Sequence, residues 1–220
     1  MVRRSRWGLL AILVAMAACV GCYPQPVEWR AWSPAPEAGD RRVVLFGDSL
    51  AAMAEQPARA LYQSHPGETW SYNAVGATRI QHWLEPMAAV TAEDVVIFEL
   101  GTNNVSLEAI NTGELPANIH AGLEELRDAR CVVALTLNTT GGDLRGSPYG
   151  TRTRWVNTEL RRLVAEGTYP NLVLLEWDQI SAGRVDWLVN PVPGGDYVHY
   201  NTAGNVAFAE QIASAPELCA

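Results

Sequence analysis

The sequence predicts an α/β fold in which a five-stranded parallel sheet lies between two layers of helices. Two observations indicate this. Short apolar runs that end at turn residues alternate with segments whose apolar residues recur at helical spacing. This strand–helix order repeats five times along the chain, and such repetition produces a parallel sheet covered on both faces. The expected architecture is therefore a three-layer α/β/α domain.

The individual elements follow from the apolar pattern in chain order. We expect strands at residues 42–46, 69–73, 94–100, 131–137 and 171–177. Helical stripes are formed by Ile119, Leu123 and Leu126, and by Trp155, Val156, Leu160, Leu163 and Val164. Right-handed crossovers place the carboxyl ends of all the strands at one edge of the sheet, where open α/β sheets bind ligands.

The first predicted strand runs directly into Gly47-Asp48-Ser49-Leu50. The residues that follow favour helix, so Ser49 is predicted at a turn from strand to helix. Exposed backbone N–H groups and the positive end of a helix dipole lie at such a turn. Ser49 is therefore the candidate nucleophile, and Asp48 is expected to hold the turn by hydrogen bonds to backbone amides.

A base for this serine is predicted near the C-terminus, in the loop Asp196-Tyr197-Val198-His199. A serine hydroxyl needs a base within hydrogen-bond reach, and a neutral imidazole can accept its proton and return it to the leaving group. Asp196 can bind the other ring nitrogen of His199 and stabilise the imidazolium. The remaining histidines lack a nearby Asp-x-x pattern, and we assign them ordinary core or surface roles.

The third predicted strand ends at Gly101-Thr102-Asn103-Asn104. Together with the serine and histidine motifs, this segment resembles the GDSL-type, or SGNH, hydrolase family over residues 42–212. The resemblance implies the flavodoxin-like fold of that family and a serine esterase that needs no cofactor. At the fourth motif position the family commonly has Asp where this chain has Asn104, which questions the fine orientation of the site.

The resemblance also implies an oxyanion hole. Its donors would be the backbone N–H groups of Ser49 and Gly76 and the side-chain amide of Asn103. A plain turn glycine is the alternative for Gly76, and a helix cap is the alternative for Asn103. Trp187, in the loop before Asp196, is the candidate substrate contact among the tryptophans, which more often lie in the core. The sequence contains no metal-ligand cluster and no phosphate-binding glycine loop.

Residues 1–18 have the composition of an export signal. Arginines near the start precede an almost wholly apolar stretch, which is shorter than the ~20 residues of a membrane span. Small residues before Cys19 resemble a bacterial lipoprotein cleavage site, and Cys22 is the rival site for lipidation. An ordinary secretory signal is the alternative. Residues 19–40 are rich in proline and suit an extended tether. Trp29 and Trp32 interrupt it and could dock on the domain or on a lipid headgroup, and we expect them on the domain.

Residues 41–220 form one domain of ordinary size. The chain has a formal net charge of −8 and contains no lysine. An acidic domain without basic clusters is a poor candidate for binding nucleic acid or an anionic membrane surface, so we expect membrane contact through a lipid anchor only. Cys131 and Cys219 are both expected at the edge of the sheet opposite the site, where export favours a disulfide over two separate thiols.

The sequence therefore predicts an exported, lipid-anchored serine esterase of the bacterial cell envelope. By resemblance, its substrates would be short-chain or O-acetyl esters, on small molecules or on glycans. A sugar O-acyltransferase with the same triad and a non-catalytic glycan-binding lipoprotein are the alternatives. The acyl group, the alcohol, the oligomeric state and the role of residues 138–151 as a lid stay open.

Overall fold

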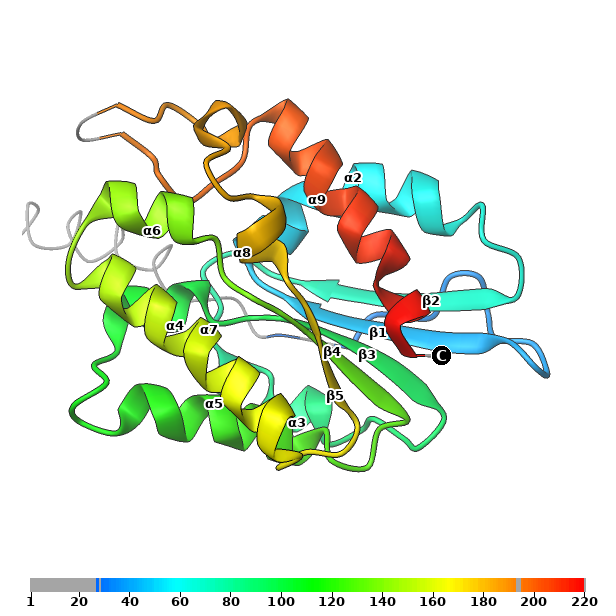
Figure 1. The fold of residues 1–220 in the computed structure, drawn as a ribbon. Coiled ribbons are helices and arrows are strands. Elements are labelled where there is room, and N and C mark those ends of the chain that lie inside the picture. Colours follow the sequence, from blue (N-terminus) through cyan, green and yellow to red (C-terminus); the bar gives the residue numbers. More distant parts are fainter. Residues whose placement is uncertain (1–26, 28, 193–194, 220) are drawn as a thin grey trace, which may run out of the picture.

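The computed structural model describes residues 27, 29–192 and 195–219 (Figure 1). The predicted signal segment and both candidate lipidation sites, Cys19 and Cys22, lie outside the described residues. No helix in the described ranges is long and apolar enough to cross a membrane.

The central sheet has five parallel strands in the order β2-β1-β3-β4-β5. The strands are β1 (Arg41–Gly47), β2 (Glu68–Ala74), β3 (Asp94–Glu99), β4 (Cys131–Leu135) and β5 (Leu172–Leu175). The chain moves outward from β1 to β2 and then returns past β1 to β3. A topological switch point therefore lies between β1 and β3, and ligands of doubly wound sheets bind at this position.

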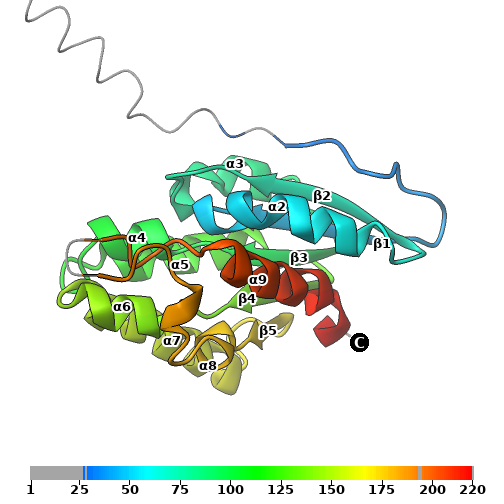
Figure 2. The same cartoon turned by 90° about the horizontal axis from the view of Figure 1, so that it is seen from above.

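Helices cover both faces of the sheet, as Figures 1 and 2 show from two directions. The helices on one face are α2 (Ser49–Tyr62) and α9 (Thr202–Ser214). Those on the other face are α3 (Leu84–Met87), α5 (Glu114–Glu125) and α7 (Tyr149–Glu166). Each layer buries its own apolar cluster against the sheet. The three-layer α/β/α architecture predicted from the sequence is thereby confirmed.

Short helices follow three of the strands at their carboxyl ends. They are α4 (Thr102–Leu107) after β3, α6 (Thr139–Arg145) after β4 and α8 (Trp177–Ile180) after β5. The 3₁₀ helices are η2 (Ile80–His82), η3 (Val185–Trp187) and η4 (Ala215–Cys219). Residues 139–145, which the sequence left open as part of a lid, therefore form a helix, and this helix packs against α7.

The strands β4 and β5 end two residues earlier than the sequence predicts. At Leu137, the side chain of Asn157 in α7 accepts a hydrogen bond from the backbone N–H at 2.7 Å and donates one to the carbonyl at 2.8 Å. A helix side chain thus satisfies the backbone groups that a sheet partner would otherwise bind. The apolar run at 171–177 likewise ends at Leu175, and Trp177 begins α8 instead of closing β5.

Residues 29–40 lie against the domain, as expected for Trp29 and Trp32. Ser33 pairs with Trp70 at the outer edge of β2, and the Arg30 N–H donates to Asn73 Oδ1 at 2.6 Å. Trp29 packs edge-on against Phe46, with ring centroids 5.8 Å apart, and Trp32 packs on the same apolar cluster. These contacts cover the outer edge of β2, whose backbone groups would otherwise have no strand partner.

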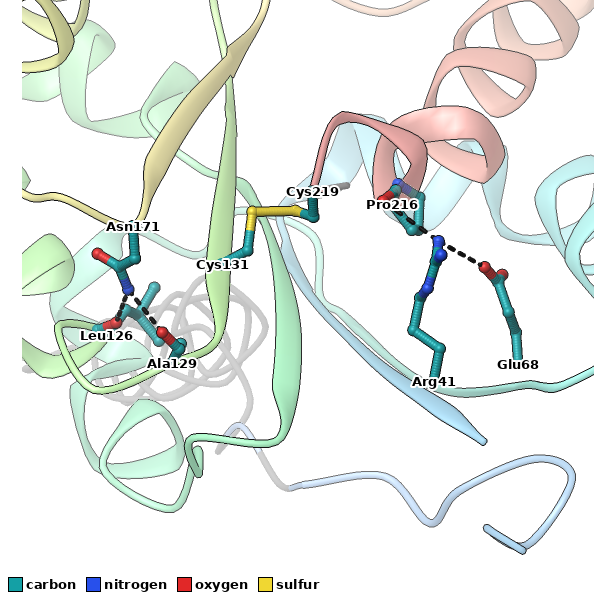
Figure 3. The surroundings of a disulfide bond; sticks show 8 residues. All are labelled: Arg41, Glu68, Leu126, Ala129, Cys131, Asn171, Pro216 and Cys219. Carbon is teal, nitrogen blue, oxygen red and sulfur yellow. Dashed lines mark hydrogen bonds and ion pairs between the residues drawn. A yellow bond between two sulfur atoms is a disulfide. The ribbon is translucent and has the colours of Figure 1, made fainter. Parts of the chain in front are cut away.

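A disulfide joins Cys131, at the start of β4, to Cys219, at the end of the chain (Figure 3). Their Cα atoms are 5.9 Å apart. Nearby, the Arg41 guanidinium donates to the Pro216 carbonyl and to Glu68, so the last turn is also held to β1 and β2. The predicted pairing therefore forms at the edge of the sheet opposite Ser49.

Candidate active site

Ser49 lies at the tight turn between β1 and α2. A Cβ atom at Gly47 would lie 2.4 Å from the Ala51 Cβ, so only glycine fits where the helix folds back against the strand. The Asp48 carboxylate caps the helix by accepting a hydrogen bond from the Leu50 N–H at 3.0 Å. The structural role predicted for Asp48 is thus present, and the turn fixes the direction of Ser49.

The structure brings Ser49, His199 and Asp196 together. The Ser49 Oγ lies 2.9 Å from the His199 Nε2, and the Asp196 Oδ2 lies 2.7 Å from the His199 Nδ1. The side chains of His199 and Asp196 are 34% and 37% exposed, respectively. This is the spatial order of a nucleophile, a base and an orienting acid.

The loop that carries His199 is ordered by its own hydrogen bonds. The Asp196 Oδ1 accepts from the backbone N–H groups of Val198 and His199, at 2.8 and 3.0 Å. Partial burial raises the pKa of Asp196, but these amides and the His199 ring outweigh it and hold the pKa below its usual range. Asp196 is therefore an anion at neutral pH, which keeps the Nδ1 proton of His199 on the side away from Ser49.

The three predicted oxyanion donors lie near Ser49. A Cβ atom added to Gly76 would lie 3.9 Å from the Ser49 Cβ. Asn103 lines the same cleft as Ser49, and its Nδ2 donates to the Thr78 carbonyl at 2.9 Å, which leaves a second amide hydrogen. Gly101 precedes α4 with a φ of +124°, a backbone conformation that favours glycine.

Asn104, which departs from the family pattern, is buried in a polar network. Its Oδ1 accepts from the Ile80 N–H at 3.1 Å, and its Nδ2 donates to the buried Glu108 carboxylate at 2.9 Å. Glu108 also accepts from Gln81 and Arg79. The network ties the start of α4, with Asn103, to the loop that contains Gly76. A carboxylate is therefore present here, supplied by Glu108 one helical turn later.

Two buried acids lie directly beneath Ser49. The Glu99 Oε2 accepts from the Asp48 N–H at 3.1 Å, and both side chains are almost wholly buried. Burial raises the pKa of Asp48 to about 6, although the Leu50 amide and the nearby His199 oppose the shift. Burial, with repulsion from Asp48, raises the pKa of Glu99 well above its usual range. Burial and repulsion therefore disfavour the ionisation of both acids at once.

Ser49 opens into a cleft of about 520 Å³, a size suited to a small ligand. The residues that line it, besides the triad and Asn103, include Thr102, Ser106, Leu107, Arg145, Gly195, Tyr197 and Val198. Sequence reasoning missed Arg145, because nothing in its local pattern distinguishes it from a surface arginine. In the described part of the chain, no group of three or more His, Cys, Asp or Glu side chains could hold a metal ion.

Trp187 does not lie among the residues that line this cleft, and its role as a substrate contact stays a prediction. Its ring stacks on Trp177 with centroids 5.7 Å apart, and the Arg184 guanidinium lies 3.7 Å from its centroid. These contacts hold the partly buried ring against the apolar cluster that α9 covers.

Residues 45–207 match the model of the GDSL-like lipase/acylhydrolase family. The chain belongs to this family. No curated protein matches it. The matched residues contain all three motifs described above, so the family assignment and the triad geometry concern the same part of the molecule.

Solved structures share the family fold at low sequence identity. The catalytic domain of peptidoglycan O-acetyltransferase A from Streptococcus pneumoniae has a TM-score of 0.61 and 20% identity, over 82% of this chain and 94% of that one. The acetylxylan esterase Axe2 from Geobacillus stearothermophilus has a TM-score of 0.56 and 13% identity, over 79% and 93%. A lipolytic protein of the G-D-S-L family from Veillonella parvula gives 0.56 and 14%, over 77% and 94%.

Proposed function

We propose that this protein is a serine esterase that hydrolyses short-chain acyl or O-acetyl esters. The observation that carries the proposal is the continuous hydrogen-bonded chain from Ser49 through His199 to Asp196, open to a cleft. Membership of an acylhydrolase family supports the reaction class. The volume of the cleft suits a short acyl group.

The proposed reaction has two steps. The Ser49 Oγ attacks the carbonyl carbon while its proton passes to the His199 Nε2, and the resulting oxyanion accepts hydrogen bonds from Ser49, Gly76 and Asn103. Collapse expels the alcohol, which takes the proton from His199. Water then attacks the acyl-enzyme with His199 as base, and the acid leaves as Ser49 regains its proton. Asp196 stabilises the imidazolium in both steps.

A second candidate function is acyl transfer to a sugar hydroxyl. The structural likeness to a peptidoglycan O-acetyltransferase domain favours it, since that domain gives a TM-score of 0.61. The triad would act in the same way, but the acceptor alcohol would replace water in the second step. The half-exposed base, at 34%, is accessible to either acceptor.

The test is hydrolysis of p-nitrophenyl acetate by the domain from residue 23 onward, beside its Ser49→Ala variant. We expect turnover in the parent protein and a loss of about 10³-fold or more in the variant. Product analysis with and without acceptor sugars separates hydrolysis from transfer. Equal turnover in both proteins would reject Ser49 as nucleophile, and no turnover by folded protein with or without acceptor would favour a glycan-binding lipoprotein.

We also propose that the protein is exported and held at the bacterial envelope by a lipid on Cys19, with Cys22 as the rival site. The basic and apolar composition of residues 1–18 supports export. The disulfide between Cys131 and Cys219 also supports it, because such bonds persist in oxidising compartments. Metabolic labelling with a fatty acid tests the anchor: loss of label in Cys19→Ala but not in Cys22→Ala identifies Cys19.

A further inference from the structure

Arg145 is the cation at the cleft that the proposed reaction does not use. It is the last residue of α6 and lines the same cleft as Ser49 and His199. No other Lys or Arg lines this cleft among the described residues. The other charged residue that lines the cleft is Asp196, and its carboxylate is hydrogen-bonded to His199.

Most arginines of this protein are neutralised by a carboxylate. Within the described ranges, the arginines that form no ion pair with Asp or Glu are Arg130, Arg145 and Arg152. Arg152 donates to the Val105 carbonyl, and neither Arg130 nor Arg152 lines the cleft. Arg145 is thus the one cation of this cleft in the described part of the chain, and it forms no ion pair with a carboxylate.

The guanidinium of Arg145 is nevertheless held in place. It lies 4.4 Å from the centre of the Tyr149 ring, and its Nη1 donates to the Ser106 Oγ at 3.4 Å. Ser106 is itself fixed by donating to the Thr102 carbonyl at 3.0 Å. Stacking on a ring fixes the plane of a guanidinium while its remaining N–H groups stay available. These groups match the two oxygens of a carboxylate.

We propose that Arg145 makes the cleft selective for esters whose alcohol part carries a carboxylate. This inference rests on the proposed esterase function and names its substrate class. The acidic domain repels anions at long range, so selectivity for an anion must come from a short-range contact inside the cleft. Arg145 supplies that contact on the α6 side of the cleft, while Ser49 and His199 act on the acyl group.

The test compares two aryl acetates of nearly the same shape, 4-acetoxybenzoate and its methyl ester. For each protein, the ratio of kcat/KM for the anionic ester to that for the neutral ester is measured. The intrinsic difference between the two leaving groups is the same in every ratio, so it cancels when the ratios of two proteins are compared. We expect Arg145→Gln to lower this ratio about tenfold, and Arg145→Lys to lower it less, because a charge remains without the planar fork.

Arg127→Gln is the matched control. It removes the same charge from an exposed i,i+3 pair with Glu124, away from the cleft, and should leave the ratio unchanged. A purely structural role for Arg145 would lower kcat/KM for both esters equally, and an unchanged ratio in Arg145→Gln would overturn the proposal. Raising the salt concentration should lower the wild-type ratio and leave that of Arg145→Gln nearly constant.

A binding measurement separates this proposal from the esterase function. Calorimetric titration of Ser49→Ala protein with 4-acetoxybenzoate requires no turnover. The anion contact is supported if Ser49→Ala protein binds 4-acetoxybenzoate more tightly than the methyl ester and if adding Arg145→Gln removes this difference. This holds even if the protein hydrolyses neither ester. Equal binding of both compounds would reject the anion contact, whatever the turnover.

Discussion

The turn that carries Ser49 lies in the core, whereas the loop that carries Asp196 and His199 lies at the surface. Asp48 and Glu99 beneath the serine are almost wholly buried, and Gly47 has no room for a side chain. The base and its partner acid are about one-third exposed and are held mainly by hydrogen bonds within their own loop. Substitutions in the turn should therefore affect folding, while those in the loop should affect chemistry alone.

The largest expected effect comes from the surface loop. His199→Ala removes the base, so kcat/KM for p-nitrophenyl acetate should fall about 10³-fold or more, while the thermal midpoint stays close to that of the parent. Steady-state kinetics and thermal unfolding of the same preparation check this. A drop in the midpoint as large as that of a core variant would contradict the contrast between the two regions.

The buried acids make stability depend on pH. Because burial raises the pKa of Asp48 from 3.8 to about 6, its contribution to stability is fully present below the unfolded pKa and is lost as pH rises through 6. This loss is on the order of 3 kcal/mol. Asp48→Asn keeps the Oδ1 cap but cannot ionise, so its free energy of unfolding should decline less between pH 4 and 8. Urea titrations at both pH values measure this, and parallel declines would contradict it.

Gly47→Ala tests the packing of the turn. The added Cβ would lie 2.4 Å from the Ala51 Cβ and 3.0 Å from the Glu99 Oε2, so the helix must shift. We expect a loss of about 1–3 kcal/mol in stability together with reduced turnover. Urea unfolding beside the kinetics measures both. Full stability with normal turnover would show that the turn is more adaptable than its burial indicates.

The smallest effect concerns the network around Asn104. Asn104→Asp restores the common family residue but removes the donor to Glu108 and places two carboxylates together. We expect kcat to fall about tenfold, equivalent to about 1.4 kcal/mol, because the network supports Asn103. Adding Glu108→Gln should recover most of the loss. A gain from Asn104→Asp alone would show that the Asn104–Glu108 pair does not replace the family carboxylate.

Much of the fold and the candidate site could be predicted because the determining signals are local. The apolar runs of the strands, the strand-to-helix turn at Ser49 and the Asp-x-x-His spacing each lie within a few residues. The missed features depend on distant partners. The end of β4 is set by Asn157, 20 residues after Leu137, and Arg145 becomes a cleft residue only because the end of α6 lies next to Ser106 of α4. The docking of Trp29 could be expected from the sequence, but its partner Phe46 in β1 could not.

Covalent labelling of the serine tests most directly whether His199 activates Ser49. Phenylmethylsulfonyl fluoride reacts with a serine that a neighbouring base activates, and peptide mass mapping locates the adduct. We expect a single sulfonyl group on Ser49 in the parent protein. The adduct should form much more slowly in His199→Ala and be absent from Ser49→Ala. An adduct on another residue, together with turnover that persists in Ser49→Ala, would contradict this expectation.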